Sequence, residues 1–276
     1  MNHSRTTAIA LRLWATALIL FLFVPIVLIC VYAFNPSNIQ SWPLHGLSTK
    51  WFSSTWHNDD MRQALWLSVR AGLISTAIAL TLGTMAAFAV HRFRFFGREA
   101  ISLMLILPLA LPGIITGMAL NSFFAFGGIS FSLTTIVIGH ATFCIVVVYN
   151  NVVARLRRTS GSLTEAAMDL GADGWQTFRD VTLPVVSTAL VAGGLLAFAL
   201  SFDEVIVTTF TAGAQNTLPL WIFGQIRLGQ RLPQVNVVVL LVMALTLIPV
   251  ILAQRLTRDT GVLRRAPGAA PTGGGD

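Results

Sequence analysis

Long apolar runs constrain the fold of this chain more than any other feature of its sequence. A helix needs about 20 apolar residues to cross the hydrocarbon core of a bilayer, which is roughly 30 Å thick. Runs of that length predict six spans, at residues 13–34, 64–90, 100–124, 133–150, 185–210 and 235–253. Only 11% of the 276 residues are charged, whereas a soluble domain carries about 25%. The sequence therefore predicts an all-α, polytopic membrane protein with six transmembrane helices.

The distribution of basic residues predicts which side of the membrane each polar segment faces. Thirteen of the 18 Lys and Arg residues lie in the N-terminus, the loop 91–99, the segment 151–184 and the C-terminal tail, whereas four lie in the intervening segments. Cytoplasmic loops are enriched in Lys and Arg, so both termini and the segment 151–184 are predicted to be cytoplasmic. This topology explains the net charge of +7 better than nucleic-acid binding does. Residues 266–276 are rich in Pro, Gly and Ala and are predicted to form a disordered tail.

The sequence predicts no metal site, no bound cofactor and no catalytic residue in this chain. Cys30 and Cys144 lie inside apolar runs, at a spacing that fits neither a metal site nor a disulfide framework. The phosphate-binding pattern G-x-x-x-x-G-K-[ST] does not occur in the sequence, so any ATP must be bound by another protein. The histidines show no pairing at ligand spacing, and we interpret His140 as a histidine packed within the membrane.

The polar segment 151–184 carries the signals of a short helix. Ser162 is followed three residues later by Glu165, which is the pattern of a capping box at a helix start. Gly171 is placed to end that helix, because glycine adopts the left-handed conformation at little cost.

A second helix start follows in the same segment. Asp173 and Gln176 have capping spacing, and Pro184 is expected to open the fifth span. Leu170 and Trp175 are apolar residues on an otherwise polar segment. Composition alone also allows an amphipathic connector that lies among the lipid headgroups.

The spacing within this segment resembles the EAA signature of bacterial type I ABC importer permeases. That signature reads E-A-A, three residues, G, nine residues, I, one residue, L-P. Here Glu165-Ala166-Ala167, Gly171 and Val181-Thr182-Leu183-Pro184 have that spacing, with Val181 in place of isoleucine. The resemblance implies a MetI-like permease domain over residues 1–265, in a bacterial cytoplasmic (inner) membrane.

In that family the Glu-Ala-Ala helix is a cytoplasmic coupling helix that sits in a cleft of the ATPase. Small residues such as Ala166 and Ala167 allow close approach, and Glu165 can pair with a basic residue of the ATPase. The resemblance thus implies an ABC ATPase dimer that binds ATP and Mg²⁺, a second permease subunit and an extracytoplasmic solute-binding protein. The expected coupling residues are Glu165, Ala166, Ala167, Leu170, Gly171, Trp175 and Pro184.

Two adjacent acids, Asp203 and Glu204, lie near the end of the predicted fifth span. An acidic residue at depth costs roughly 2.5–3.5 kcal/mol on insertion scales, so acids there usually have a function. One interpretation is an acidic lining that meets a cationic solute. The alternative is that both acids lie at the outer interface and only anchor the helix.

The surroundings of these acids are similar to the spermidine/putrescine branch of the permease family. The similarity lies in Ser201-Phe202-Asp203-Glu204 and in residues 49–52, 216–222 and 232–236. It implies import of a polyamine such as putrescine or spermidine, or of another small organic cation, by alternating access. The residues expected along the substrate pathway are Ser201, Asp203, Glu204 and Trp51.

One position departs from that branch. Some polyamine permeases carry an acid in the third span after the proline that matches Pro112, whereas this chain has Gly113. Other solutes therefore stay open, including amino-acid derivatives and organic acids. A secondary transporter or channel is a further alternative, in which the acids would respond to an ion gradient. A membrane enzyme would need a base, a nucleophile or a metal cluster beside the acids, and the sequence has none there.

Overall fold

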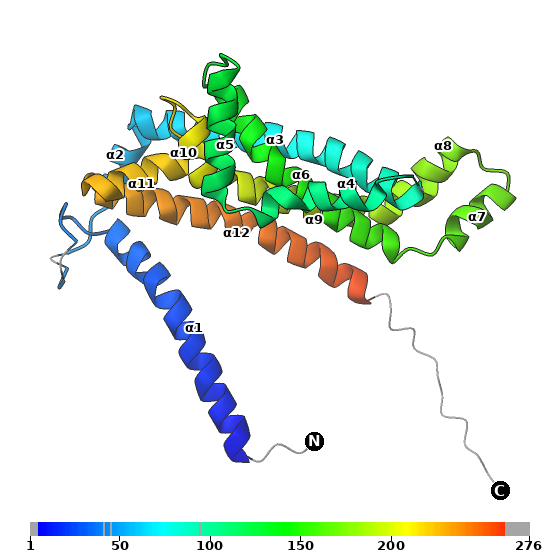
Figure 1. Cartoon of the computed structure of the whole chain (residues 1–276). Helices are drawn as coiled ribbons and strands as arrows, with labels where there is room; N and C mark the ends of the chain where they lie inside the picture. Colours follow the sequence, from blue (N-terminus) through cyan, green and yellow to red (C-terminus); the bar gives the residue numbers. More distant parts are fainter. Residues whose placement is uncertain (1–4, 41, 45, 94, 263–276) are drawn as a thin grey trace, which may run out of the picture. The chain divides into compact units, whose positions relative to one another are not determined.

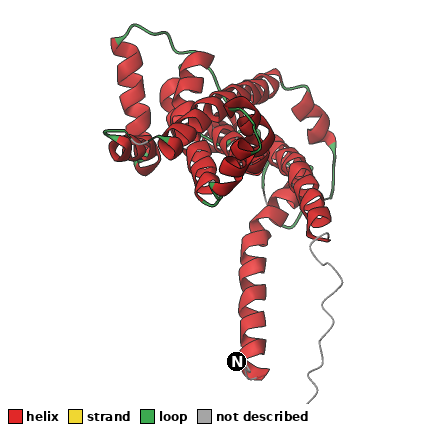
Figure 2. Cartoon of the chain, turned by 90° about the vertical axis from the view of Figure 1, so that its right-hand side faces the viewer, coloured by secondary structure: helices red, strands yellow, loops and turns green. Residues whose placement is uncertain are grey.

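The computed structural model describes residues 5–40, 42–44, 46–93 and 95–262. Every regular element in these ranges is helical (Figures 1 and 2), which confirms the all-α prediction. The predicted tail 266–276 lies outside the described residues. The chain divides into two compact units: a central unit, Asn58–Gly224, and a terminal unit, Met1–His57 with Gln225–Asp276.

The central unit contains the helices from α3 to α10 and the first part of α11. Its elements are α3 (Asp59–Arg92), α4 (Arg98–Ala110), α5 (Gly113–Phe126), α6 (Leu133–Arg157), α7 (Ser162–Asp169), α8 (Gly174–Gln176), the π-helix η1 (Thr177–Thr182), α9 (Leu183–Phe202), α10 (Ile206–Thr211) and α11 (Leu218–Leu228). The helices α3, α6 and α9 lie side by side (Figure 1). Helix α7 lies on the connection from α6 to α9.

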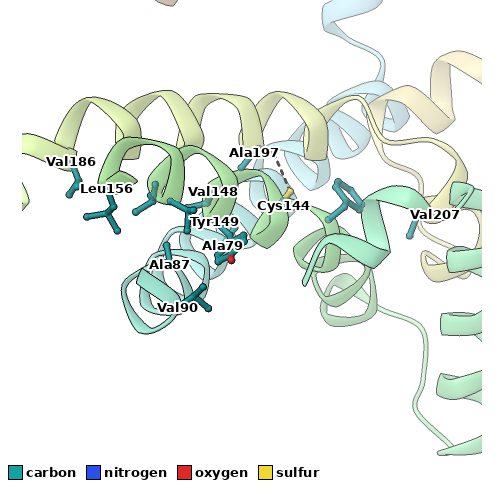
Figure 3. Packing of buried hydrophobic residues seen from close by; sticks show 13 residues of the cluster. Ala79, Ala87, Val90, Cys144, Val148, Tyr149, Leu156, Val186, Ala197 and Val207 are labelled. Carbon is teal, nitrogen blue, oxygen red and sulfur yellow. Dashed lines mark hydrogen bonds between the residues drawn. The ribbon is translucent and has the colours of Figure 1, made fainter. Parts of the chain in front are cut away.

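The core of the central unit forms where α3, α6 and α9 meet (Figure 3). Small residues allow this close approach, because a Cβ atom on Gly83 of α3 would lie 2.8 Å from the backbone oxygen of Ile145 in α6. The Cys144 thiol donates to the carbonyl of Ala197 at 3.3 Å, which joins α6 to α9. Buried apolar residues surround these contacts: Ala79, Ala87, Val90, Val148, Tyr149, Val152, Leu156 and Val186.

The membrane spans differ in form from one another. Four helices are long and apolar enough to cross a bilayer, and α4 with α5 makes a fifth candidate that is bent by 104°. The bend follows from Pro112, because a proline lacks a backbone N–H and forces the preceding residue, here Leu111, into the extended region. The expected fifth span also breaks, since α9 ends at Phe202 and α10 begins at Ile206. Helix α12 adds a shorter apolar stretch, Leu232–Leu247, so the number of six spans stays a prediction.

The terminal unit contains α1 (Arg5–Ala33), α2 (Lys50–Trp56) and α12 (Leu232–Val262). The indole N–H of Trp51 donates to the carbonyl of Asn35 at 2.8 Å, just beyond the end of α1. The Gln234 amide of α12 donates to the hydroxyl of Ser54 at 2.6 Å. These two bonds hold the short helix α2 against both long helices of its unit.

Candidate functional sites

Helix α7 begins one residue earlier than the sequence pattern suggested. Its N-cap is Gly161, whose carbonyl accepts the amides of Thr164 and Glu165 at 3.0 and 3.2 Å. The Ser162 hydroxyl hydrogen-bonds with the Ser160 hydroxyl at 2.6 Å and caps nothing. The predicted capping box is therefore wrong. Gly161, which has no side chain, is the N-cap, and Ser162 is the first residue of the helix. The Glu165 side chain stays exposed on the first turns.

The end of α7 agrees with the prediction made for Gly171. The amide of Gly171 donates to the Met168 carbonyl at 2.9 Å, and the amide of Ala172 donates to the Ala167 carbonyl at 3.0 Å. These two bonds form a Schellman motif, which needs a left-handed residue after the helix. Gly171 supplies it, with φ of +87°.

The helix after this turn also starts where expected. The Asp173 carboxylate accepts the amides of Trp175 and Gln176, both at 2.8 Å, and the Gln176 side chain accepts the Asp173 amide at 2.9 Å. This reciprocal pair is a complete capping box.

Pro184 does not open a separate span, which corrects the expectation. A helical stretch runs from Gly174 to Phe202 through the π-helix η1, and Pro184 is the second residue of α9. A proline ring inside an α-helix clashes with the carbonyl four residues before it. The wider turn of η1, immediately before Pro184, provides room for the ring and keeps the helix continuous.

Apolar side chains are exposed at the end of α7 and on α8. Leu170 is 90% exposed and Trp175 is 68% exposed. Ala166 is exposed and Ala167 is half-buried. We call the surface made by α7, Leu170, Gly171 and Trp175 the α7 surface.

Aromatic rings connect the α7 surface to the long helices. Trp175 stacks on Phe178 at a centroid distance of 5.7 Å, and Phe178 packs edge-on against Phe88 of α3, also at 5.7 Å. The rings thus form a continuous line of contacts from Trp175 through Phe178 of η1 to Phe88 of α3.

The two acids occupy the break between α9 and α10 but have different environments. Glu204 is half-buried, and its carboxylate accepts the amide of Val207 at 2.9 Å, so it caps the start of α10. Asp203 ends α9 and is exposed. Within the described part of the chain its carboxylate has no hydrogen bond or ion pair. Asp203 is therefore the more accessible of the two carboxylates.

Ser201 is buried in the last turn of α9, where it meets a histidine of α6. Its hydroxyl lies 2.7 Å from Nδ1 of His140, and Nε2 of His140 lies 2.8 Å from the hydroxyl of Thr208 in α10. The interpretation of His140 as a packed histidine described its burial and missed its partners. A buried imidazole needs two hydrogen-bonding groups, and that need indicates that His140 has polar partners. The hydroxyls of Ser201 and Thr208 are these partners.

The break in the α4–α5 pair lies beside the break after α9. A Cβ atom on Gly113 would lie 3.7 Å from Ile206 of α10, and the Asn121 side chain of α5 donates to the Phe210 carbonyl at 2.7 Å. The glycine that replaces the expected acid therefore lies next to the segment that carries the two acids.

Trp51 belongs to the terminal unit, whereas Ser201, Asp203 and Glu204 belong to the central unit. It lies on α2, with the Lys50 ammonium 4.6 Å from the centroid of its ring. Among the described residues, no group of three or more His, Cys, Asp and Glu side chains is placed to hold a metal ion.

Comparison with known proteins places these features in a family. Residues 79–262 match the family described as the binding-protein-dependent transport system inner membrane component. The spermidine/putrescine transport system permease protein PotC of Escherichia coli (strain K12) is 34% identical over 246 residues, which cover 88% of this chain and 92% of PotC. The putrescine transport system permease protein PotI of the same organism is 35% identical over 232 residues, which cover 81% of this chain and 82% of PotI.

A solved structure supports the fold. One chain in the crystal structure of a bacterial ABC transporter involved in the import of the acidic polysaccharide alginate superposes with a TM-score of 0.66 at 17% identity, covering 94% of this chain and 99% of that chain. The chain therefore belongs to the binding-protein-dependent transport system inner membrane components, and it is a permease subunit of an ABC importer, a transport component rather than an enzyme.

Proposed function

We propose that this permease moves a small organic cation, a polyamine such as putrescine or spermidine, from a solute-binding protein to the cytoplasm. The observation that carries the proposal is the exposed carboxylate of Asp203 at a break in an apolar helix. Exposing a charge at such a position is costly unless it faces water or a polar partner. The relatives PotC and PotI, whose names specify spermidine and putrescine, support the same class of solute.

We further propose that the α7 surface is where the ATPase docks. Its apolar side chains are exposed although they lie outside the long apolar helices, which is typical of a contact surface for another protein. Glu165, Ala166, Ala167 and Leu170 would enter the cleft of the ATPase, and Gly171 would allow the sharp exit of the chain. ATP and Mg²⁺ would be bound by the ATPase, so this chain itself would hold no cofactor.

The continuous helix through Pro184 supports a mechanical link between the two sites. The stretch from Gly174 to Phe202 has 29 residues and reaches from Trp175 to the acid-bearing break. A helix transmits movement along its axis as a rigid body, so closure of an ATPase dimer on the α7 surface would shift the break. Such a shift can alternate the access of a solute site between the two sides of the membrane.

The proposed assembly has this chain, a second and different permease chain, two ATPase chains and an extracytoplasmic solute-binding protein. Both termini of this chain would face the cytoplasm.

Co-purification of the ATPase with the intact permease tests the docking proposal, and Leu170→Asp is the informative variant. We expect the ATPase to be lost with this variant, because a charge would replace the most exposed apolar side chain of the surface. Retention of the ATPase would contradict the assignment.

Neutralising the acids tests the substrate proposal. The double variant Asp203→Asn with Glu204→Gln keeps the shape of both side chains, and the amide oxygen of the new glutamine can still cap α10. A charge-assisted contact contributes roughly 1.5–3 kcal/mol, so uptake of labelled putrescine into vesicles, normalised to permease content, should fall at least about tenfold. Glu99→Gln, which neutralises an exposed acid at the start of α4, is the matched control and should leave uptake unchanged. Unimpaired uptake by the double variant would remove the acids from the pathway.

A different small solute is the second candidate, and Gly113 is the observation that favours it. An uncharged residue beside the acidic break leaves fewer negative charges for a cation with several amino groups. Competition between labelled putrescine and unlabelled amino-acid derivatives or organic acids separates the two candidates. Only the polyamine hypothesis predicts that unlabelled spermidine competes while organic acids do not.

A further inference from the structure

A chain of hydrogen bonds crosses the break between α9 and α10 and passes through His140 of α6. Ser201 precedes the break and Thr208 follows it, and the imidazole bonds to both hydroxyls at 2.7 and 2.8 Å. The Thr208 hydroxyl in turn donates to the carbonyl of Glu204 at 2.7 Å. His140, Ser201 and Thr208 are each at most 2% exposed.

The chemistry of these groups sets the direction of every bond in the chain. A carbonyl can only accept a hydrogen bond, so Thr208 donates its single hydroxyl hydrogen to the carbonyl of Glu204. Nε2 of His140 must then carry the proton and donate to Thr208. Nδ1 is left as an acceptor and receives the hydroxyl hydrogen of Ser201. A neutral imidazole supplies one donor and one acceptor, which matches the two positions.

This chain of bonds connects the residues on both sides of the two acids. The carbonyl of Glu204 is held by Thr208, and the carboxylate of Glu204 caps the amide of Val207. Both bonds lie within residues 204–208, and His140 joins this start of α10 to Ser201 in the last turn of α9. Buried polar groups that lose their partner are costly, so the acid-bearing break is tied to the imidazole.

We propose that His140 is a positioning residue that holds the α9–α10 break in the geometry in which Asp203 faces the solute. The inference rests on the proposed function, since it assigns His140 a role through the carboxylates of that site. His140 itself does not touch the solute. Its loss should therefore weaken binding of the cation more than it slows turnover.

Three substitutions separate the two bonds of the imidazole. His140→Asn places its amide near Nδ1 and keeps the bond to Ser201, whereas His140→Gln reaches the position of Nε2 and keeps the bond to Thr208. His140→Leu removes both bonds while it fills the space. Because His140→Leu removes the bonds to both Ser201 and Thr208, and Thr208 holds the Glu204 carbonyl, we expect it to raise the KM for putrescine about tenfold, which lies within the combined net contribution of two hydrogen bonds. His140→Gln should recover most of that loss and His140→Asn less of it.

The matched control is His91→Leu, which changes an exposed histidine at the end of α3. It should leave both KM and maximal uptake unchanged. A merely structural role for His140 would lower the permease content and maximal uptake with an unchanged KM, and it would show no difference between Gln and Asn. Either result would overturn the inference.

A second measurement tests the geometry of the α9–α10 break without measuring transport. Asp203→Cys, in a permease with Cys30→Ser and Cys144→Ser, can be modified with a neutral, membrane-impermeant thiol reagent. Adding His140→Leu should change the rate of modification at least about threefold, whereas Gly128→Cys in the turn between α5 and α6 should react at an unchanged rate. If the acids prove irrelevant to uptake, the substrate proposal fails while this rate change still supports the positioning role. An unchanged rate at Asp203→Cys, or an equal change at Gly128→Cys, would overturn it.

Discussion

At the scale of single residues, Gly171 makes the proposed coupling depend on one backbone angle. Its φ of +87° lies in the left-handed region, and a Cβ atom there would meet nothing within 4 Å. The cost of a side chain is thus purely conformational, about 1–2 kcal/mol for an L-residue. We expect Gly171→Asp to insert normally and to lose most of the ATPase stimulation, because the turn is strained and a charge enters the α7 surface. Measurement of ATPase activity in reconstituted vesicles with the binding protein checks this.

Gly161→Asp is the matched control for that variant. Gly161 lies at the other end of α7 with φ of −60° and equally open space, and aspartate is a favourable N-cap residue. The same charge is therefore added to the same helix without backbone strain. If both variants lost stimulation equally, added charge rather than the left-handed turn would be the cause.

The two acids should have different effects on putrescine uptake when they are changed one at a time. Glu204→Gln keeps an oxygen for the Val207 amide, whereas Asp203→Asn removes the exposed charge. We expect Asp203→Asn alone to produce most of the fall in putrescine uptake and Glu204→Gln to lower uptake no more than about threefold, the effect of a weak long-range charge. A larger loss from Glu204→Gln than from Asp203→Asn would reverse the assignment of the solute contact.

At the scale of helices, the packing of α3 on α6 depends on the absence of a side chain at Gly83. A Cβ atom there would lie 2.8 Å from the Ile145 carbonyl and 3.0 Å from the Cβ of Val148, so the two backbones would have to separate. Overpacking of this kind typically costs about 1–3 kcal/mol. Gly83→Ala should lower the thermal unfolding midpoint of the purified permease in detergent. Gly224→Ala, where a Cβ atom meets nothing within 4 Å, should leave the midpoint unchanged or raise it, and equal losses from the two would contradict the packing argument.

At the scale of the whole molecule, the proposed orientation in the membrane can be tested across α6. This helix has 25 residues and is about 37 Å long at 1.5 Å per residue, enough to separate its two ends by a bilayer. An impermeant thiol reagent applied from outside should modify Gly128→Cys, before α6, and should not modify Ser160→Cys, after it. Both variants need the background with Cys30→Ser and Cys144→Ser. Modification of Ser160→Cys from outside would show that the orientation of α6 is the opposite of the proposed one.

Local chemistry explains the features that could be read from the sequence alone. The apolar runs predict membrane helices because their length is matched to the bilayer. Gly171 and the Asp173–Gln176 box could be located because caps are made with residues three or four positions away. The family signature follows the same rule, since its members lie within one segment of the chain.

Other features were decided by contacts between distant parts of the chain. The partners of His140 lie 61 and 68 residues away, and no local pattern reports which hydroxyls a buried imidazole will meet. The helix start at Gly161 is instead a local feature, because the Gly161 carbonyl accepts the amides of Thr164 and Glu165 and the Ser162 hydroxyl bonds to Ser160. The different roles of Asp203 and Glu204 arose only when α10 formed, because its first amides needed an acceptor and the side chain of Glu204 was in reach.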